Sequence, residues 1–127
     1  MGYIDTYYSR TLAEDRPRPA LSGRKEADCI VVGGGLAGLT TALELARGGL
    51  RVVVLEAERV GWGASGRNGG IVSASYACEG DAIAARVGDV AAKALHRLSV
   101  EGVARVRAAI SDLNIGGVDP CPGLLNL

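Results

Sequence analysis

The chain has 127 residues, which is enough for one domain with a hydrophobic core. Its 14 lysines and arginines balance its 14 aspartates and glutamates, so no overall charge draws it to nucleic acid or to an anionic membrane. Aromatic residues make up only 4% of the sequence, whereas its 19 glycines are concentrated in a few segments, which indicates loops with a function.

Residues 1–26 are predicted to form an extended N-terminal arm. Pro17 and Pro19 favour extended backbone at the residues that precede them. The arm begins without the basic and then apolar pattern of a secretory signal. Its tyrosines are expected to anchor it on the domain surface rather than to contact a ligand; they are Tyr3, Tyr7 and Tyr8.

Residues 27–56 read as a strand, a glycine turn, a helix and a second strand. The apolar runs Cys29–Val32 and Val52–Leu55 are typical of parallel strands that are buried on both faces. The helix between them is expected to run to Arg47 and to end at the pair Gly48-Gly49. Its spacing predicts an apolar face against the sheet, made of Leu36, Leu39, Leu43 and Ala46.

The turn itself carries Gly33, Gly35 and Gly38, with Glu56 roughly 20 residues further on at the tip of the second strand. In a dinucleotide-binding fold these glycines allow a sharp turn, close approach of a pyrophosphate and tight packing of the helix. The acid accepts hydrogen bonds from an adenosine ribose and repels the 2′-phosphate of NADP. A glycine turn that binds nothing is the alternative, but the presence of the acid argues against it.

A second glycine-rich segment, residues 61–70, follows the acid directly. A flexible linker is one interpretation, but linkers are usually monotonous, and this segment carries Trp62, Arg67 and Asn68. Arginine and asparagine side chains can donate hydrogen bonds to the carbonyl or phosphate oxygens of a ligand. We therefore expect contact with a cofactor.

The remaining chain is predicted to be mainly helical. A short helix is expected over residues 81–87, and a long one is expected from an N-cap at Asp89 to about Asn114. Residues 71–75 are expected to form either a short strand or an extended lead-out, and residues 124–127 resemble the start of a strand. His96, the sequence's one histidine, is expected to be solvated or packed rather than catalytic.

Other classes of protein are disfavoured. The uncharged run from Cys29 to Leu43 is too short to span a bilayer, and three scattered cysteines favour a reducing compartment, which we take to be the cytoplasm. The glycine turn lacks the Gly-Lys-Ser/Thr of a P-loop, and no cysteines and histidines have zinc-site spacing. Nothing in the sequence resembles a nucleophile elbow or an array of basic and aromatic residues for nucleic acid.

The motifs VVGGG-x-x-GL, VVVLEA and GASGRNGG together resemble the FAD-dependent oxidoreductases of the D-amino-acid-oxidase-like superfamily. Within that superfamily the sequence is most similar to the gamma-glutamylputrescine oxidoreductase group. The resemblance covers residues 18–127, and GASGRNGG is its most specific part. It implies FAD as cofactor and a small-molecule amine as substrate, oxidised by hydride transfer to flavin N5 with oxygen as the final acceptor.

The same resemblance implies a set of FAD-binding residues and no catalytic or metal-binding ones. The pyrophosphate turn, the ribose acceptor and the contacts to the ribityl chain and isoalloxazine would come from Gly33, Gly35, Leu36, Ala37, Gly38, Glu56, Ala57, Ala64, Ser65, Arg67, Asn68, Gly69 and Gly70.

The expected fold is α/β, a partial Rossmann-like FAD/NAD(P)-binding domain over residues 27–127. The family's substrate domain is not recognisable in the sequence, so we expect a truncated product or fragment that is inactive alone. Two alternatives remain open. One is part of a nicotinamide-dependent dehydrogenase, which would leave GASGRNGG unexplained, and the other is a non-catalytic nucleotide-binding or partner-binding fragment.

Overall fold

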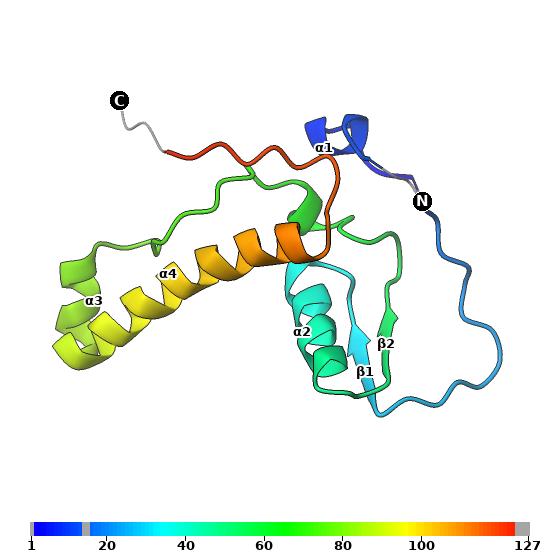
Figure 1. Cartoon of the computed structure of the whole chain (residues 1–127), viewed down its shortest axis with the longest axis horizontal. Coiled ribbons are helices and arrows are strands. Elements are labelled where there is room, and N and C mark those ends of the chain that lie inside the picture. The colour runs from blue at the N-terminus through cyan, green and yellow to red at the C-terminus, as the bar shows by residue number, and fades with distance from the viewer. Residues whose placement is uncertain (1, 14–15, 124–127) are drawn as a thin grey trace. The chain divides into compact units, whose positions relative to one another are not determined.

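The computed structural model describes residues 2–13 and 16–123 of the chain (Figure 1). These residues form an α/β arrangement that divides into two units, one ending at Gly69 and the other starting at Gly70. The elements are α1 (Tyr7–Arg10), β1 (Cys29–Val32), α2 (Leu36–Arg47), β2 (Val52–Leu55), the 3-10 helix η1 (Ala64–Gly66), α3 (Gly80–Val87) and α4 (Asp89–Asp112). The α/β class predicted from the sequence is confirmed.

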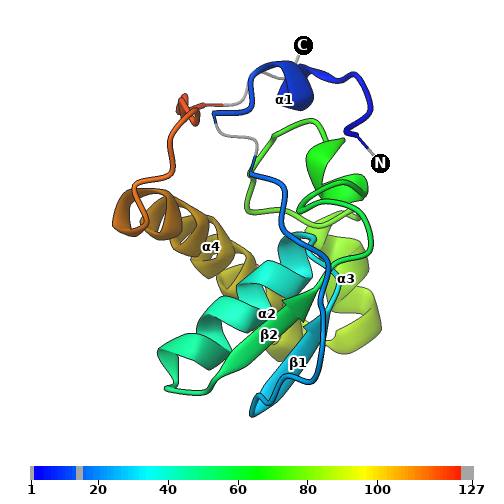
Figure 2. The same cartoon turned by 90° about the vertical axis from the view of Figure 1, so that its right-hand side faces the viewer.

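The first unit is built on the predicted β–α–β arrangement. Strands β1 and β2 pair in parallel, with Cys29 opposite Val52 and Val32 opposite Leu55. Figures 1 and 2 show the two strands side by side, with α2 packed against them. Both strands and the end of the helix lie at their predicted positions, because β-branched runs separated by glycines leave little choice of boundary.

The face of α2 that packs on the sheet is not the predicted one. The buried or half-buried positions are Gly38, Ala42, Leu43 and Leu45, of which Gly38, Ala42 and Leu45 recur at helical spacing. The leucines at 36 and 39 are instead 67% and 39% exposed, and Ala46 is exposed as well. Small residues allow the closest approach of a helix to a sheet, and this turns the glycine and alanine side inward. The leucine stripe was therefore a wrong prediction, apart from the half-buried Leu43.

Strand β1 is covered on one face only. Cys29 and Val31 are half-buried, whereas Ile30 and Val32 are 63% and 83% exposed. The alternation follows from the pleat of a strand, which sends successive side chains to opposite faces. Burial on both faces was thus a wrong prediction for β1 within the described residues, since α2 covers a single side.

The N-terminal arm contains a helix that was not predicted. Helix α1 begins after Thr6, whose hydroxyl accepts a hydrogen bond from the Ser9 N–H while the Ser9 hydroxyl accepts one from the Thr6 N–H. Such a reciprocal capping box stabilises even one helical turn. The arm around Pro17 and Pro19 has no regular secondary structure.

The second unit pairs α3 with α4 (Figure 1). Helix α4 starts one residue earlier than predicted, because its N-cap is Gly88, with φ of 80°, and Asp89 is its first residue. Residues 71–75 form no strand, so of the two predicted alternatives the irregular connecting segment is the one observed. The strand expected at residues 124–127 lies outside the described residues. Among the described helices, none combines the length and the apolar character that crossing a membrane requires.

Candidate cofactor site

The first glycine turn joins β1 to α2 through backbone positions that favour glycine. Gly33 has φ of 103°, and its N–H donates to the Leu55 carbonyl at 2.7 Å. A Cβ at Gly38 would collide with the carbonyl oxygen of Gly33, so glycine is needed where the helix passes over the turn. Gly35 is the N-cap of α2. The turn therefore places the N-terminus of α2 directly at the end of β1.

Glu56 follows β2 and reaches back to this turn. One carboxylate oxygen accepts from the Gly34 N–H at 2.6 Å and the other from the Glu58 N–H at 2.9 Å. The N–H groups of Glu58 and Gly34, and more weakly that of Ala57, lower the pKa of the Glu56 carboxyl below its ordinary value. The acid is therefore ionised at neutral pH and stands next to the glycine turn.

Gly34 belongs to this site although the sequence did not single it out. It is buried, and a Cβ there would lie 3.1 Å from the Glu56 carboxylate. Its carbonyl also accepts a hydrogen bond from the Gly61 N–H at 2.9 Å. The signal for it was the run of three glycines, of which the dinucleotide-binding pattern explains only the outer two.

Ser65 connects the second glycine segment to the first. It lies in η1, and its hydroxyl accepts a hydrogen bond from the Leu36 N–H at 2.8 Å. Because α2 has no side-chain cap and no acidic residue in its first turn, this hydroxyl is the acceptor at the positive end of the helix. A Cβ at Gly35 would lie only 3.0 Å from the same oxygen. The two glycine segments therefore meet at the N-terminus of α2.

The polar side chains that follow Ser65 are engaged with the segment's own backbone. The guanidinium of Arg67 stacks over the Trp62 ring at 4.4 Å and donates to the Trp62 carbonyl at 2.8 and 3.0 Å. The amide of Asn68 donates to the Ser65 carbonyl at 2.8 Å. These contacts give the segment a defined shape, as expected of a functional loop.

The remaining predicted residues lie around this centre. Ala37 is exposed in the first turn of α2, Ala57 is exposed next to Glu56, and Ala64 is exposed at the start of η1. Gly69 ends the first unit, and Gly70, with φ of 69°, starts the second. The structure thus brings together the residues from Gly33 to Gly38, Glu56 and Ser65.

Comparison with known proteins decides the family. The family described as FAD dependent oxidoreductase matches residues 28–127. The chain belongs to this family. Membership confirms the resemblance seen in the motifs, and it confirms FAD as the family cofactor.

Individual members of the FAD-dependent oxidoreductases support the assignment. The chain is 40% identical over 113 residues to gamma-glutamylputrescine oxidoreductase of Escherichia coli K12, covering 89% of this chain and 26% of that protein. It is 39% identical over 101 residues to the probable oxidoreductase OrdL of Haemophilus influenzae, covering 80% and 23%. The chain thus spans about a quarter of the length of these relatives. No solved structure matches it.

The residues present fit FAD. An ionised carboxylate at the tip of β2 suits ribose hydroxyls, and the N-terminus of α2 suits a pyrophosphate. Side chains at positions 34 and 35 would intrude on Glu56 and Ser65, so glycine keeps this cradle open.

Proposed function

We propose that residues 27–127 supply the first part of the FAD site of an amine-oxidising flavoprotein, and that these residues alone do not oxidise amines. The proposal rests on one observation above all. The two glycine segments meet at the N-terminus of α2, with the ionised Glu56 beside them. The relative named for gamma-glutamylputrescine supports an amine as substrate.

In this proposal each residue has a defined task. Glu56 accepts hydrogen bonds from the adenosine ribose, and the first turn of α2, with Ser65, binds the pyrophosphate. The segment from Arg67 to Gly70 lies along the ribityl chain and the isoalloxazine. Bound FAD would supply a hydride acceptor for oxidation of the carbon next to an amine nitrogen, with oxygen as the final electron acceptor.

A nicotinamide-dependent dehydrogenase is the second candidate, since it would use the same first glycine turn. The observation against it is the bond between Ser65 and Leu36, which ties the family-specific segment to the cofactor turn. We also propose that the protein works in the cytoplasm, because its cysteines at 29, 78 and 121 are unpaired thiols.

Replacing Glu56 by glutamine tests the proposal in the full-length protein. Glu56→Gln keeps the shape but loses the charge and one acceptor, so we expect FAD affinity to fall by roughly tenfold or more. Titration of flavin fluorescence measures it. The control is Glu101→Gln, whose carboxylate lies on α4 at 3.8 Å from Arg97 and should not affect affinity.

Two outcomes would contradict the proposal. Binding of FAD by Glu56→Gln as tightly as by the unaltered protein would remove the role given to the carboxylate. Tight binding of NADH by the unaltered protein, with no binding of FAD, would establish the nicotinamide-dependent alternative.

A further inference from the structure

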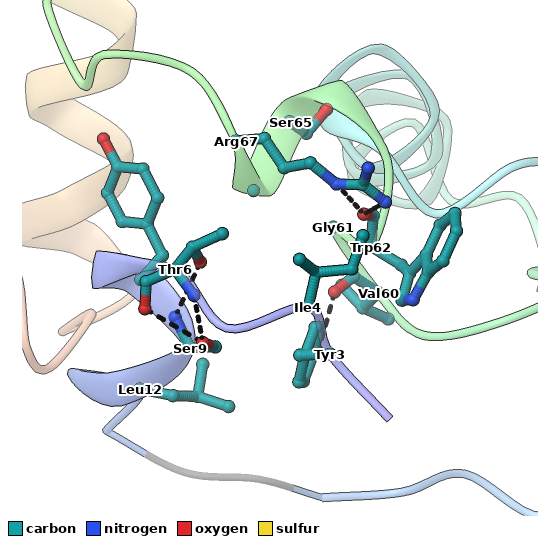
Figure 3. A pocket seen from close by; sticks show the side chains of 12 residues that line it. Tyr3, Ile4, Thr6, Ser9, Leu12, Val60, Gly61, Trp62, Ser65 and Arg67 are labelled. Carbon is teal, nitrogen blue, oxygen red and sulfur yellow. Dashed lines mark hydrogen bonds between the residues drawn. The ribbon is translucent and has the colours of Figure 1, made fainter. Parts of the chain in front are cut away.

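The N-terminal arm makes direct contacts with the segment between Glu56 and Ser65. The Tyr3 hydroxyl donates to the Val60 carbonyl at 2.9 Å, and the indole N–H of Trp62 donates to the Gly2 carbonyl at 3.1 Å. The guanidinium of Arg59 lies over the Tyr3 ring, 5.2 Å from its centroid. Figure 3 shows Tyr3 pointing at Val60 beside Trp62. Three interactions thus join the arm to residues 59–62.

These contacts are specific rather than part of a packed core. A cavity of about 220 Å³ lies beside these contacts, lined by residues of both the arm and the segment 60–67, and Ile4, Leu12 and Trp62 are among its lining residues (Figure 3). The arm keeps its own shape through the capping box at Thr6 and through an ion pair between Arg10 and Asp5, with both bonds at 2.6 Å. The arm is therefore a folded element that contacts residues 59–62 through a few polar interactions.

The segment that contains residues 59–62 also bonds to the first glycine turn. The Gly61 N–H donates to the Gly34 carbonyl, and Ser65, shortly after it in the chain, caps Leu36. Glycines at 61, 63 and 66 give this segment large conformational freedom when nothing holds it. Contacts that hold residues 59–62 therefore restrict the path of the chain between Glu56 and Ser65.

We propose that the N-terminal arm is a positioning device for the cofactor site, in which Tyr3 and Trp62 hold the loop in the conformation that receives FAD. This inference rests on the proposed function. Tyr3 and Trp62 act through Glu56 and Ser65, so they are positioning residues rather than catalytic ones. The arm contributes to affinity because part of the ordering of the loop is complete before FAD arrives.

Conservative substitutions test the arm in the full-length protein. Tyr3→Phe removes one hydroxyl and keeps the ring under Arg59, and Trp62→Phe removes the indole N–H and keeps a ring under Arg67. Each loses one hydrogen bond, so we expect the dissociation constant for FAD to rise about two- to tenfold. Tyr7→Phe is the matched control, because Tyr7 lies on the same arm, is 75% exposed and packs on Tyr8.

A second readout requires no activity and separates positioning from simple stability. If the docked arm favours FAD binding, FAD must favour the docked arm by the same factor. Both Arg10 and Arg24 are exposed, but Arg10 ends helix α1, so trypsin cleavage after Arg10 reports local opening of the folded arm, and cleavage after Arg24 is the internal control. We expect FAD to slow cleavage after Arg10 in the unaltered protein and to slow it less in Tyr3→Phe, with cleavage after Arg24 unchanged.

The outcomes separate this inference from the proposed function. If the unaltered protein binds no FAD, the proposed function fails. If it binds FAD, but Tyr3→Phe and Trp62→Phe bind as tightly as Tyr7→Phe, the positioning role is overturned. The same follows if FAD leaves the cleavage after Arg10 unchanged.

Discussion

Glu56 already accepts two backbone hydrogen bonds, yet it retains capacity for a ligand. An ionised carboxylate offers about four lone-pair sites, and the N–H groups of Gly34 and Glu58 take one on each oxygen. This leaves capacity for the hydrogen bonds from ribose hydroxyls that we propose. These N–H groups thus orient the carboxylate and keep it charged, and the carboxylate can still accept further hydrogen bonds.

Two helical glycines should respond in opposite ways to the same substitution. Gly38→Ala places a Cβ against the carbonyl of Gly33, and we expect it to lower the free energy of unfolding by about 1–3 kcal/mol. Gly102→Ala meets no atom within 4 Å in α4, and we expect it to raise that free energy by roughly 0.5–1 kcal/mol. Thermal unfolding followed by circular dichroism measures both. Stabilisation by Gly38→Ala would contradict the close approach of α2 to the turn.

At the scale of elements, an ion pair joins the starts of the two strands. Asp28 accepts from the Arg51 guanidinium at 2.9 and 3.2 Å and from the Arg51 backbone N–H at 2.8 Å. These bonds, the side-chain ones above all, lower the pKa of the Asp28 carboxyl. A depressed pKa stabilises the fold at pH above the unfolded-state pKa, and this stabilisation is lost as pH falls through the folded-state value.

Replacing this acid should change the pH dependence of stability. We expect Asp28→Asn to unfold more easily than the unaltered protein at neutral pH, and the difference to shrink in acid below the ordinary range of aspartate. Urea unfolding at a series of pH values measures it. Glu26→Gln is the control, since its pair with Arg24 is at 3.4 Å and largely exposed. A difference that stays constant across the acid range would refute the ion pair.

The elements differ in how well the sequence predicted them. The strands and the end of α2 could be predicted, because runs such as Val52–Leu55 and the pair Gly48-Gly49 carry local signals. The face of α2 could not, because the leucine period is local whereas the choice of side depends on the clash at Gly38. The N-cap of α4 was misplaced by one residue, since both Gly88 and Asp89 suit that position.

The site was predictable in part for the same reason. The pattern of glycines and acid, placed between a β-branched run and a helix, indicated Gly33, Gly35, Gly38 and Glu56. The bond from Gly34 to Glu56 and the contact of Tyr3 with Val60 link residues far apart in the chain, and no local pattern encodes such contacts. The tyrosine was nonetheless expected to anchor the arm, and its hydroxyl is the atom that does so.

At the scale of the whole molecule, the first unit presents an apolar sheet face to solvent. Ile30 and Val32 are 63% and 83% exposed on the side of β1 opposite α2. Exposed apolar strands tend to associate with other chains. Within the described residues, nothing covers these two side chains to the extent that a sheet core would.

Association of the 127-residue chain should depend on this face. We expect Ile30→Thr with Val32→Thr to reduce self-association, because the double substitution removes apolar surface and keeps β-branched residues that suit a strand. Size-exclusion chromatography with light scattering measures it. Val90→Thr, at a position 87% exposed on α4, is the matched control. Equal association of both variants and the parent would show that the sheet face has no such effect.

The bond between Ser65 and Leu36 has a further consequence for turnover of the nucleotide. The chain supplies its own oxygen at the amide where we propose that a phosphate binds, so the Leu36 N–H would keep an acceptor after FAD leaves. When FAD binds or leaves, the Leu36 N–H would exchange a phosphate oxygen and the Ser65 hydroxyl oxygen as its acceptor. We therefore expect this bond to hold the two glycine segments together when FAD is absent.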